Sequence, residues 1–424
     1  MTAELALALA RAAVLHCRVE RPQVLIVRDT RESGEMLESA IAAGVTAAGG
    51  DALIAGVLPT PAAPLLVLRH ALHLAAVISA SHNPYEDNGI KLFAADGFKL
   101  HDETEHEIEA ELDKPALPVE SIGRVRRLHG ALEDYVRELH VRFAGLDLTG
   151  TRVLLDCANG ATYRAAPEIF RRLGARVDVI ADQPDGRNIN DGCGSTHLGC
   201  VSTAMARGAY DVAFAFDGDG DRVLAVDAAG EVVDGDELIA LAAIHLRSEG
   251  RLPGNGVAVT VMTNFGFHTA MRRAGIDVAT TAVGDRYVLD ELRKRGWKLG
   301  GEQSGHIIEL GFGPSGDGIA SALLTLEALA GRDLRDRDAM HKLPQRLVNI
   351  RAADRALLAE AIEHDDVRLA IDREQAELGG RGRVLVRPSG TEPLVRVMVE
   401  APTRRETDEV CERLAQVVES ALAR

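Results

Sequence analysis

The chain has 424 residues, which is too long for a single hydrophobic core and predicts about three domains of ordinary size. Its formal net charge of −16 argues against nucleic acid and anionic membrane surfaces as partners, because both attract an excess of lysine and arginine. The five cysteines are scattered, odd in number and without a Cys-x-x-Cys pair, so they suggest neither a disulfide framework nor a zinc site. No window reaches transmembrane length, and a reducing cytoplasm fits the cysteine usage best.

Short apolar runs alternate with helical patterns along most of the chain. This alternation predicts α/β units with parallel or mixed sheets. An apolar helical segment over 4–17 precedes the first unit, and the pattern restarts near residue 152 and again near residue 256. We therefore expect three similar α/β domains. In the first of them, we expect strands over 23–27, 52–55 and 75–79 and a helix over 35–48.

The C-terminal part has a different order of predicted strands and helices. Apolar strands over 383–386 and 394–400 flank a loop and precede a helix over 406–422, which predicts a smaller α+β domain. We place the four domains at 1–130, 131–236, 237–345 and 346–424. No low-complexity linker marks these boundaries.

Three aspartates, Asp217, Asp219 and Asp221, follow an apolar run that ends at Phe216. Three carboxylates at one strand end repel one another unless a cation compensates them, and hard oxygen ligands suit Mg²⁺. A calcium-binding EF-hand loop is excluded, because Arg222 stands at its sixth position and Ala228 at its twelfth. The remaining alternative is a polar turn between two strands, since Asp and Gly favour turns.

A serine lies at a comparable strand end. Ser81 follows the apolar strand 75–79, and the Asn-Pro pair that begins at Asn83 stops regular structure there. A serine so placed can act as a nucleophile, with His82 and Lys91 available for charge or proton transfer. The alternative is a hydrogen-bonded turn without catalytic function.

A third motif lies in the C-terminal domain, between the two predicted strands. Backbone amides and hydroxyls around a Ser-Gly-Thr sequence can form a concave donor site, and two flanking arginines can grip a phosphate dianion. A hairpin loop with flanking arginines is an equal alternative. The residues of this motif are Arg387, Ser389, Gly390, Thr391 and Arg396.

Two further loops carry polar groups. The loop 300–306 offers hydrogen-bond donors and acceptors suited to sugar hydroxyls, including Glu302 and Ser304, although an ordinary polar loop fits as well. In the stretch 283–288, Asp285 is positioned to cap the following helix, and Arg286 could reach a phosphate.

These motifs, in this order along the chain, resemble the α-D-phosphohexomutase family. The resemblance extends from about residue 3 to the C-terminus and includes stretches outside the four motifs. The matching stretches are 28–34, 58–62, 78–84, 156–163, 217–222, 283–288, 300–306 and 389–398.

The resemblance implies four domains around a central cleft, each donating one loop. Ser81 matches the phosphorylated serine, and its phosphate oxygen together with Asp217, Asp219 and Asp221 corresponds to the ligands of one Mg²⁺ per chain. Glu302 and Ser304 match the sugar-binding residues, and the arginine-flanked Ser-Gly-Thr loop matches the site of the non-reacting phosphate. The positions that line the reaction centre are Lys91, Arg222 and His306.

The function implied is an isomerase that interconverts glucosamine 6-phosphate and glucosamine 1-phosphate through a phosphoserine and a 1,6-bisphosphate, with glucosamine or glucose 1,6-bisphosphate as activator. Alternatives are isomerisation of glucose or mannose phosphates, a serine-dependent sugar-phosphate phosphatase, and a non-catalytic sugar-phosphate binder. The expected partner is a small phosphosugar, and a homodimer is left open. Family members usually begin with a segment resembling Phe-Gly-Thr-Asp-Gly-Val-Arg-Gly, so we expect that the start codon has been placed downstream of the true one.

Overall fold

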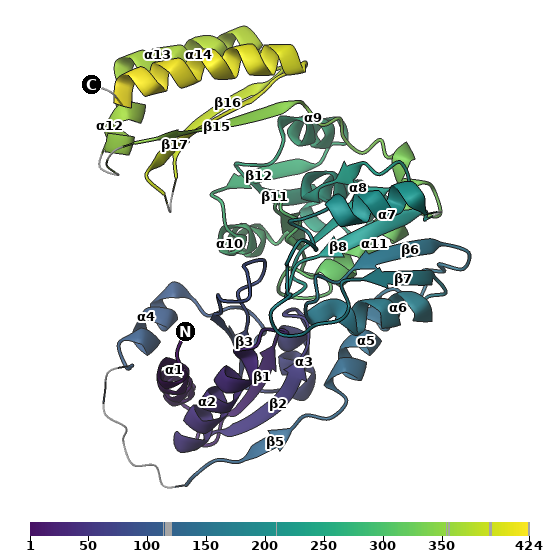
Figure 1. The fold of residues 1–424 in the computed structure, drawn as a ribbon, viewed down its shortest axis with the longest axis vertical. Coiled ribbons are helices and arrows are strands. Elements are labelled where there is room, and N and C mark those ends of the chain that lie inside the picture. The colour runs from purple at the N-terminus through teal and green to yellow at the C-terminus, as the bar shows by residue number, and fades with distance from the viewer. Residues whose placement is uncertain are drawn as a thin grey trace. The chain divides into compact units, whose positions relative to one another are not determined.

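The computed structural model describes residues 1–112, 114, 121–208, 210–352, 354, 357–389 and 392–422 (Figure 1). Its internal contacts divide the chain into two compact units. Unit 1 contains Met1–Val261 and Ile276–Arg337, and unit 2 contains Met262–Gly275 and Asp338–Arg424. No helix among the described residues is long and apolar enough to cross a bilayer.

The first sheet of unit 1 has the strand order β4-β3-β1-β2-β5. All neighbouring pairs are parallel except β3 and β4, so the sheet is mixed, as predicted. Helices α1 and α2 pack together over one side of this sheet, and α3 lies on the other (Figure 1). The elements are α1 (Ala3–His16), β1 (Gln23–Arg28), α2 (Gly34–Ala47), β2 (Asp51–Val57), α3 (Ala62–His70), β3 (Leu74–Ile78), β4 (Ile90–Ala94), α4 (Asp102–Glu109) and β5 (Val125–Arg127).

Sequence explains why α1 forms and where it packs. Thr2 caps the helix by accepting a hydrogen bond from the Leu5 amide at 3.3 Å, and alanines, the best helix formers, fill much of it. Its contact with α2 is close: a Cβ added at Gly44 would lie 2.3 Å from the carbonyl oxygen of Leu7. Small residues therefore allow the two helix backbones to approach.

The second sheet repeats the arrangement with the order β10-β9-β8-β6-β7. Its β6, β7 and β8 are parallel, whereas β9 and β10 form an antiparallel extension. Strand β8 is buried along its whole length, which explains why it reads as a continuous apolar run. The elements are α5 (Ala131–Arg142), β6 (Arg152–Asp156), the 3₁₀ helix η1 (Ala161–Tyr163), α6 (Ala165–Arg172), β7 (Arg176–Ile180), α7 (Gly199–Arg207), β8 (Val212–Phe216), β9 (Val223–Asp227) and β10 (Val232–Val233).

The third sheet completes unit 1 with the order β12-β11-β13-β14, of which only β14 is antiparallel to its neighbour. The three sheets confirm the prediction of three similar α/β folds with mixed sheets. The elements are α8 (Gly235–Ser248), η2 (Pro253–Asn255), β11 (Gly256–Thr260), β12 (Asp277–Thr281), α10 (Asp285–Arg295), β13 (Leu299–Gly301), β14 (Ile307–Glu309), α11 (Gly318–Leu329) and η3 (Leu334–Asp336).

Unit 2 is built on an antiparallel sheet with the order β15-β17-β16, and α13 and α14 cover one face of it (Figure 1). This confirms the smaller α+β fold. Residues 262–275, which fall inside the predicted third domain, group with unit 2, where the Phe265 amide donates to Glu400 Oε2 at 2.9 Å. The elements are α9 (Phe265–Arg273), β15 (Gln345–Arg351), α12 (Leu357–Glu363), α13 (Asp365–Leu378), β16 (Arg383–Pro388), β17 (Leu394–Glu400) and α14 (Arg404–Leu422).

One local prediction is wrong. Asp285 does not cap α10, because Gly284 is the N-cap and Asp285 is already the first helical residue. The backbone at this cap has a φ of 134°, a conformation that glycine adopts without strain and other residues avoid. The Asp285 carboxylate instead pairs with Lys99.

A buried pair connects the second and third folds of unit 1. The Tyr135 hydroxyl on α5 donates to the Asp317 carboxylate, which also caps α11 by accepting from the Ala320 amide at 2.9 Å. Burial raises the pKa of Asp317 to about 6, although the Ala320 amide and the Tyr135 hydroxyl favour the charged form. This carboxyl therefore takes up a proton more readily in the folded chain than in the unfolded one.

We expect the free energy of unfolding of unit 1 to fall as the pH rises through 6, because deprotonating buried Asp317 costs more in the folded state. Relative to Asp317→Asn, which cannot titrate, the wild type should lose about 1 kcal/mol between pH 5 and pH 7.5. Fluorescence of Trp297, the single tryptophan, which is buried in unit 1, reports this transition in urea. Asp290→Asn on exposed α10 is the control, and an equal pH dependence in all three proteins would contradict the assignment.

Candidate functional site

Ser81 lies in a loop directly after β3, and its conformation is held from several sides. Its φ is +52°, in the left-handed region that residues other than glycine seldom adopt. The Ser81 amide donates to Ser79 Oγ at 2.9 Å, and Ser79 Oγ donates to Asp29 Oδ2 at 2.6 Å. These two hydrogen bonds offset part of the strain in the backbone of Ser81.

Two side chains from other segments bind the carbonyls of the same loop. Buried Arg31, which is ion-paired with Asp29, donates to the carbonyl oxygens of Ser81 and Asn83 at 2.9 Å each and to those of Pro84 and Asp87. Asn190 donates to the Ser81 and Asn83 carbonyls at 2.9 and 3.0 Å. The position of the serine therefore depends on residues about 50 and 109 positions away in the chain.

The three aspartates come together at the end of β8, as the sequence predicted. One carboxylate oxygen from each of Asp217, Asp219 and Asp221 lies within 4.8 Å of the other two, and all three residues are buried. The Ser81 hydroxyl donates to Asp217 Oδ2 at 2.5 Å. The predicted nucleophile and the predicted metal ligands thus form one site.

Basic side chains from neighbouring strands and loops surround the aspartates. Lys91 Nζ on β4 lies 2.6 Å from Asp219 Oδ2 and 3.2 Å from Asp221 Oδ2. Arg222 Nε lies 3.8 Å from Asp221 Oδ1, and His306 Nδ1 lies 3.5 Å from the same oxygen. These three residues were all expected at the reaction centre.

The charges of the site shift one another's protonation. Burial, and then the neighbouring carboxylates of Asp221 and Asp219, raise the pKa of Asp217 well above its usual range. Burial also opposes ionisation of Asp221, but Lys91 and His306 hold its pKa well below that range. Burial disfavours the charged form of Lys91, yet Asp219 and Asp221 raise its pKa. The surroundings of Asp217 and Asp221 therefore shift the pKa values of these two carboxyls in opposite directions.

The aspartate cluster fits a divalent cation. Asp219 Oδ1 and Asp221 Oδ1 are buried and have no hydrogen-bond partner among the described residues. Oxygens in the octahedral shell of Mg²⁺ are roughly 3–4 Å apart, and the three carboxylate oxygens here all lie within 4.8 Å of one another, so they are close enough to share one ion. All the available donors are hard oxygens, which Mg²⁺ prefers and zinc does not require.

The loop between β13 and β14 brings further predicted residues to the third fold of unit 1. Glu302 Oε1 accepts from the Gly284 amide at 3.0 Å, while Ser304 is exposed at the tip of the turn. His306 is buried, and its Nε2 lies 3.7 Å from Asp285 Oδ2.

Arg286, predicted to reach a phosphate, pairs here with Asp102 and with Glu105, the latter at 3.0 Å. His82, next to the nucleophile, is exposed, and its Nδ1 lies 3.5 Å from Ser81 Oγ.

The glycine between the first two aspartates is required by packing. A Cβ added at Gly218 would lie 2.7 Å from the Ser81 carbonyl oxygen and 2.8 Å from Asn190 Nδ2. The Gly218 carbonyl in turn accepts from the Ala161 amide at 2.8 Å, and the Asp219 carbonyl accepts from the Thr60 amide at 2.8 Å. The aspartate loop is therefore the place where backbones of the first and second folds meet.

The predicted phosphate-binding residues lie in unit 2. Arg387 on β16 and Arg396 on β17 are direct cross-strand partners, and like charges in such positions repel. Burial and the Arg396 charge lower the pKa of Arg387. Ser389 Oγ lies 3.5 Å from a terminal guanidinium nitrogen of Arg396, whose Nε is buried without a hydrogen-bond partner among the described residues. Gly390 and Thr391 lie outside the described residues.

Several residues of the site were not predicted from the sequence. Thr60 Oγ1 donates to Asp219 Oδ2 at 2.6 Å, and Asn190 and Asp29 hold the serine loop as described above. Thr60 follows a strand and stands between two prolines, which is a detectable turn signal, whereas nothing local distinguishes Asn190 from other loop asparagines.

Four consecutive segments match the four domains described for phosphoglucomutase/phosphomannomutase: residues 1–118 match domain I, 133–230 domain II, 234–347 domain III and 347–417 the C-terminal domain. The chain belongs to this family. Members are isomerases, and the predicted phosphohexomutase resemblance is confirmed.

Similar proteins were found by sequence and by structure. The chain is 48% identical to the phosphoglucosamine mutase of Parafrankia sp. (strain EAN1pec), covering 100% of this chain and 96% of the relative. It is 47% identical to that of Pelotomaculum thermopropionicum, covering 96% and 93%. A phosphoglucomutase/phosphomannomutase family protein from Burkholderia thailandensis has a similar fold, with a TM-score of 0.83, 22% identity, and coverage of 99% and 94%. The fold also resembles Aspergillus fumigatus N-acetylphosphoglucosamine mutase in complex with GlcNAc-6P and magnesium, with a TM-score of 0.68, 21% identity, and coverage of 85% and 92%.

Because Asn190 binds the carbonyls of the serine loop, we expect Asn190→Ala to lower the isomerase kcat by roughly 10- to 100-fold while the fold persists. The matched control is Asn188→Ala on the same loop, whose side chain bonds Gln183 and Asp185 but not the serine loop. Steady-state kinetics and urea unfolding of both variants test this. Full activity in Asn190→Ala would show that the serine is held without it.

Proposed function

We propose that this chain interconverts glucosamine 6-phosphate and glucosamine 1-phosphate. The observation that carries the proposal is its 46–48% identity to relatives named phosphoglucosamine mutase, over nearly the full length of both chains. The arrangement of Ser81 and the three aspartates in one buried site supports it, because a phosphoryl transfer needs a carrier and a cation beside each other.

In the proposed reaction Ser81 carries the phosphoryl group. Phosphoserine gives its phosphoryl group to the C1 oxygen of glucosamine 6-phosphate: the C1 hydroxyl loses its proton as its bond to phosphorus forms, and Ser81 Oγ gains a proton as its own bond to phosphorus breaks. The resulting 1,6-bisphosphate turns over, and Ser81 Oγ then attacks the 6-phosphoryl group and loses its proton, while the C6 oxygen gains one, which leaves glucosamine 1-phosphate. The left-handed backbone and the carbonyl contacts of Arg31 and Asn190 fix Ser81 Oγ in place for both transfers.

Asp217, Asp219 and Asp221 would hold Mg²⁺ together with an oxygen of the phosphoserine. Bound there, the ion would stabilise negative charge on the oxygens of the transferring group. Lys91 and Arg222 add positive charge on the same side of the site, since both lie close to these carboxylates. His306 and His82 are the nearby groups with an imidazole that can carry a proton.

Substrate recognition is assigned to three segments, namely the loop 300–306, the first turn of α10 and the arginine-flanked Ser-Gly-Thr loop. Glu302 and Ser304 would bind sugar hydroxyls, and Arg286 would contact a phosphate after leaving its present partners on α4. Arg387, Ser389 and Arg396, with Gly390 and Thr391, would bind the phosphate that does not react. The repulsion between the cross-strand arginines supports this, because a dianion between them would relieve it.

The activator is proposed to be glucosamine or glucose 1,6-bisphosphate, which supplies the first phosphoryl group to Ser81. A cytoplasmic location suits a soluble phosphosugar substrate and a chain whose described cysteines are all free.

The proposal is tested by measuring kcat/KM for glucosamine, glucose and mannose 6-phosphates with Mg²⁺ and a trace of 1,6-bisphosphate. We expect a clear preference for glucosamine 6-phosphate, and loss of turnover in Ser81→Ala but not in Ser248→Ala, an exposed serine on α8. Faster turnover of glucose or mannose phosphate would overturn the substrate assignment. Sustained release of inorganic phosphate without isomerisation would identify a phosphatase.

The metal assignment is tested separately by calorimetric titration of the chain with MgCl₂. We expect about one ion to bind, and Asp219→Asn to weaken its affinity at least about tenfold, because a ligand oxygen and a negative charge are lost. Asp191→Asn, an exposed aspartate in the same fold, should leave the affinity unchanged. Equal Mg²⁺ affinity in wild type and Asp219→Asn would refute the site.

A further inference from the structure

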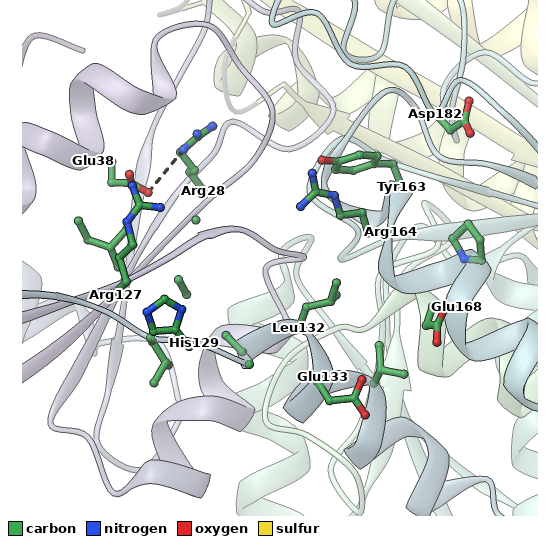
Figure 2. A pocket seen from close by; sticks show the side chains of 18 of the residues that line it. Arg28, Glu38, Arg127, His129, Leu132, Glu133, Tyr163, Arg164, Glu168 and Asp182 are labelled. Carbon is green, nitrogen blue, oxygen red and sulfur yellow. Dashed lines mark ion pairs between the residues drawn. The ribbon is translucent and has the colours of Figure 1, made fainter.

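Figure 2 shows an open groove of about 1000 Å³ in unit 1, and neither Ser81 nor the three aspartates of the candidate site line it. None of the described residues proposed to act in catalysis or to bind substrate or metal lines it. Small-molecule sites typically measure about 300–1000 Å³, so the groove can hold a ligand of nucleotide size. Its walls come from the end of β1, α2, β2, the segment 127–133, α5, the segment 163–172 and two positions near β7.

Charged side chains dominate the lining. The acidic members other than Asp182 are ion-paired with two arginines: Arg28 pairs with Glu35 at 2.9 Å and with Glu38 at 3.5 Å. In the same way, Arg172 pairs with Glu133 and Glu168 at 2.7 Å each. The acidic groups are thus mostly paired. The charged residues of the lining are Arg28, Glu35, Glu38, Arg127, His129, Glu133, Arg164, Glu168, Arg171, Arg172 and Asp182.

Three cations of the groove remain. Arg127, Arg164 and Arg171 make no ion pair within the part of the chain that the structure describes, although Arg164 stacks over the Tyr163 ring at 4.9 Å. Figure 2 shows Arg127 and Arg28 on one wall and Arg164 on the wall facing them. The lining holds five arginines and five carboxylates, so these three arginines are distinguished not by a net charge of the groove but by having no ion pair among the described residues and by lying together in one concavity.

One wall also contains buried polar atoms without hydrogen bonds. Arg28 Nε and Glu38 Oε2 are buried and, among the described residues, have no hydrogen-bond partner, although they lie 3.5 Å apart as an ion pair. Such atoms are costly unless another group binds them. They lie beside Arg127, where a ligand in the groove would have access to the same wall.

We propose that this groove binds a small organic anion that carries two or more phosphate groups, such as a nucleoside diphosphate. Arg127 on one wall and Arg164 with Arg171 on the other would each bind one phosphate, because guanidinium groups suit phosphate oxygens. Ile54, Leu132 and Pro167 supply apolar surface for the uncharged part of the ligand. The site is additional to the one that carries the proposed isomerase reaction.

The test uses inorganic pyrophosphate as probe, in calorimetric titrations without divalent metal. Wild type should bind one more equivalent, or bind at least about tenfold more tightly at one class of site, than the variant Arg127→Ala/Arg164→Ala. The matched control is Arg126→Ala. Arg126 precedes Arg127 on β5, does not line the groove, and by strand alternation lies on the opposite face.

Binding at the proposed phosphosugar site is common to all three proteins, so only the difference between them reports on the groove. Unchanged Trp297 unfolding in urea would show that the double variant is folded, and if it is not, Arg164→Gln alone replaces it. Crystals soaked in tungstate provide a direct readout, with anomalous density expected between Arg127 and Arg164. Identical pyrophosphate binding in wild type and variant, or tungstate density at other sites alone, would overturn the proposal.

Discussion

The mutual repulsion of three buried aspartates is the constraint on which the site depends. Their carboxylates lie within 4.8 Å of one another in the interior of unit 1, where water screens charge poorly. The chain compensates them with Lys91 from β4 of the first sheet and Arg222 from the loop itself, and it places the imidazole of His306, which directly precedes β14 of the third sheet, 3.5 Å from Asp221 Oδ1. The convergence of three folds on one loop thus has an electrostatic reason.

The same loop is also a point of steric contact. A side chain at Gly218 would strike the serine loop, and one at Gly305 would lie 2.1 Å from the carbonyl oxygen of Val223. The Gly220 carbonyl accepts from the Gly318 amide at 3.0 Å, so even the start of α11 is bonded to this loop. Charge and close backbone packing therefore act together: neither the aspartates nor their neighbours can move independently.

Much of the architecture could be predicted because it is local. Continuous apolar runs such as Val212–Phe216 mark buried strands, and three carboxylates within five residues mark a site at the strand end. The family resemblance then joined motifs that are distant in sequence. What it did not reveal depends on contacts between distant residues: Asn190 reaches the serine across 109 positions, and Thr60 reaches Asp219 across 159. The N-cap at Gly284 was not predicted, because the types of the neighbouring residues do not determine the backbone angles that this glycine adopts. The grouping of α9 with unit 2 likewise follows from tertiary contacts alone.

The contacts made by Arg31 have a consequence for how the nucleophile loop can change. Arg31 donates to four carbonyl oxygens between Ser81 and Asp87, and Asn190 donates to two of the same oxygens. Every residue type has the same backbone carbonyl group, so these hydrogen bonds do not depend on the side chains of the loop. Tyr85 and Glu86 are therefore free to diverge among descendants of this chain without displacing the serine, whereas Arg31 is not. The side chains of the loop can therefore vary while its backbone stays in place, because the loop conformation is set by the residues that bind its carbonyl oxygens, Arg31 and Asn190.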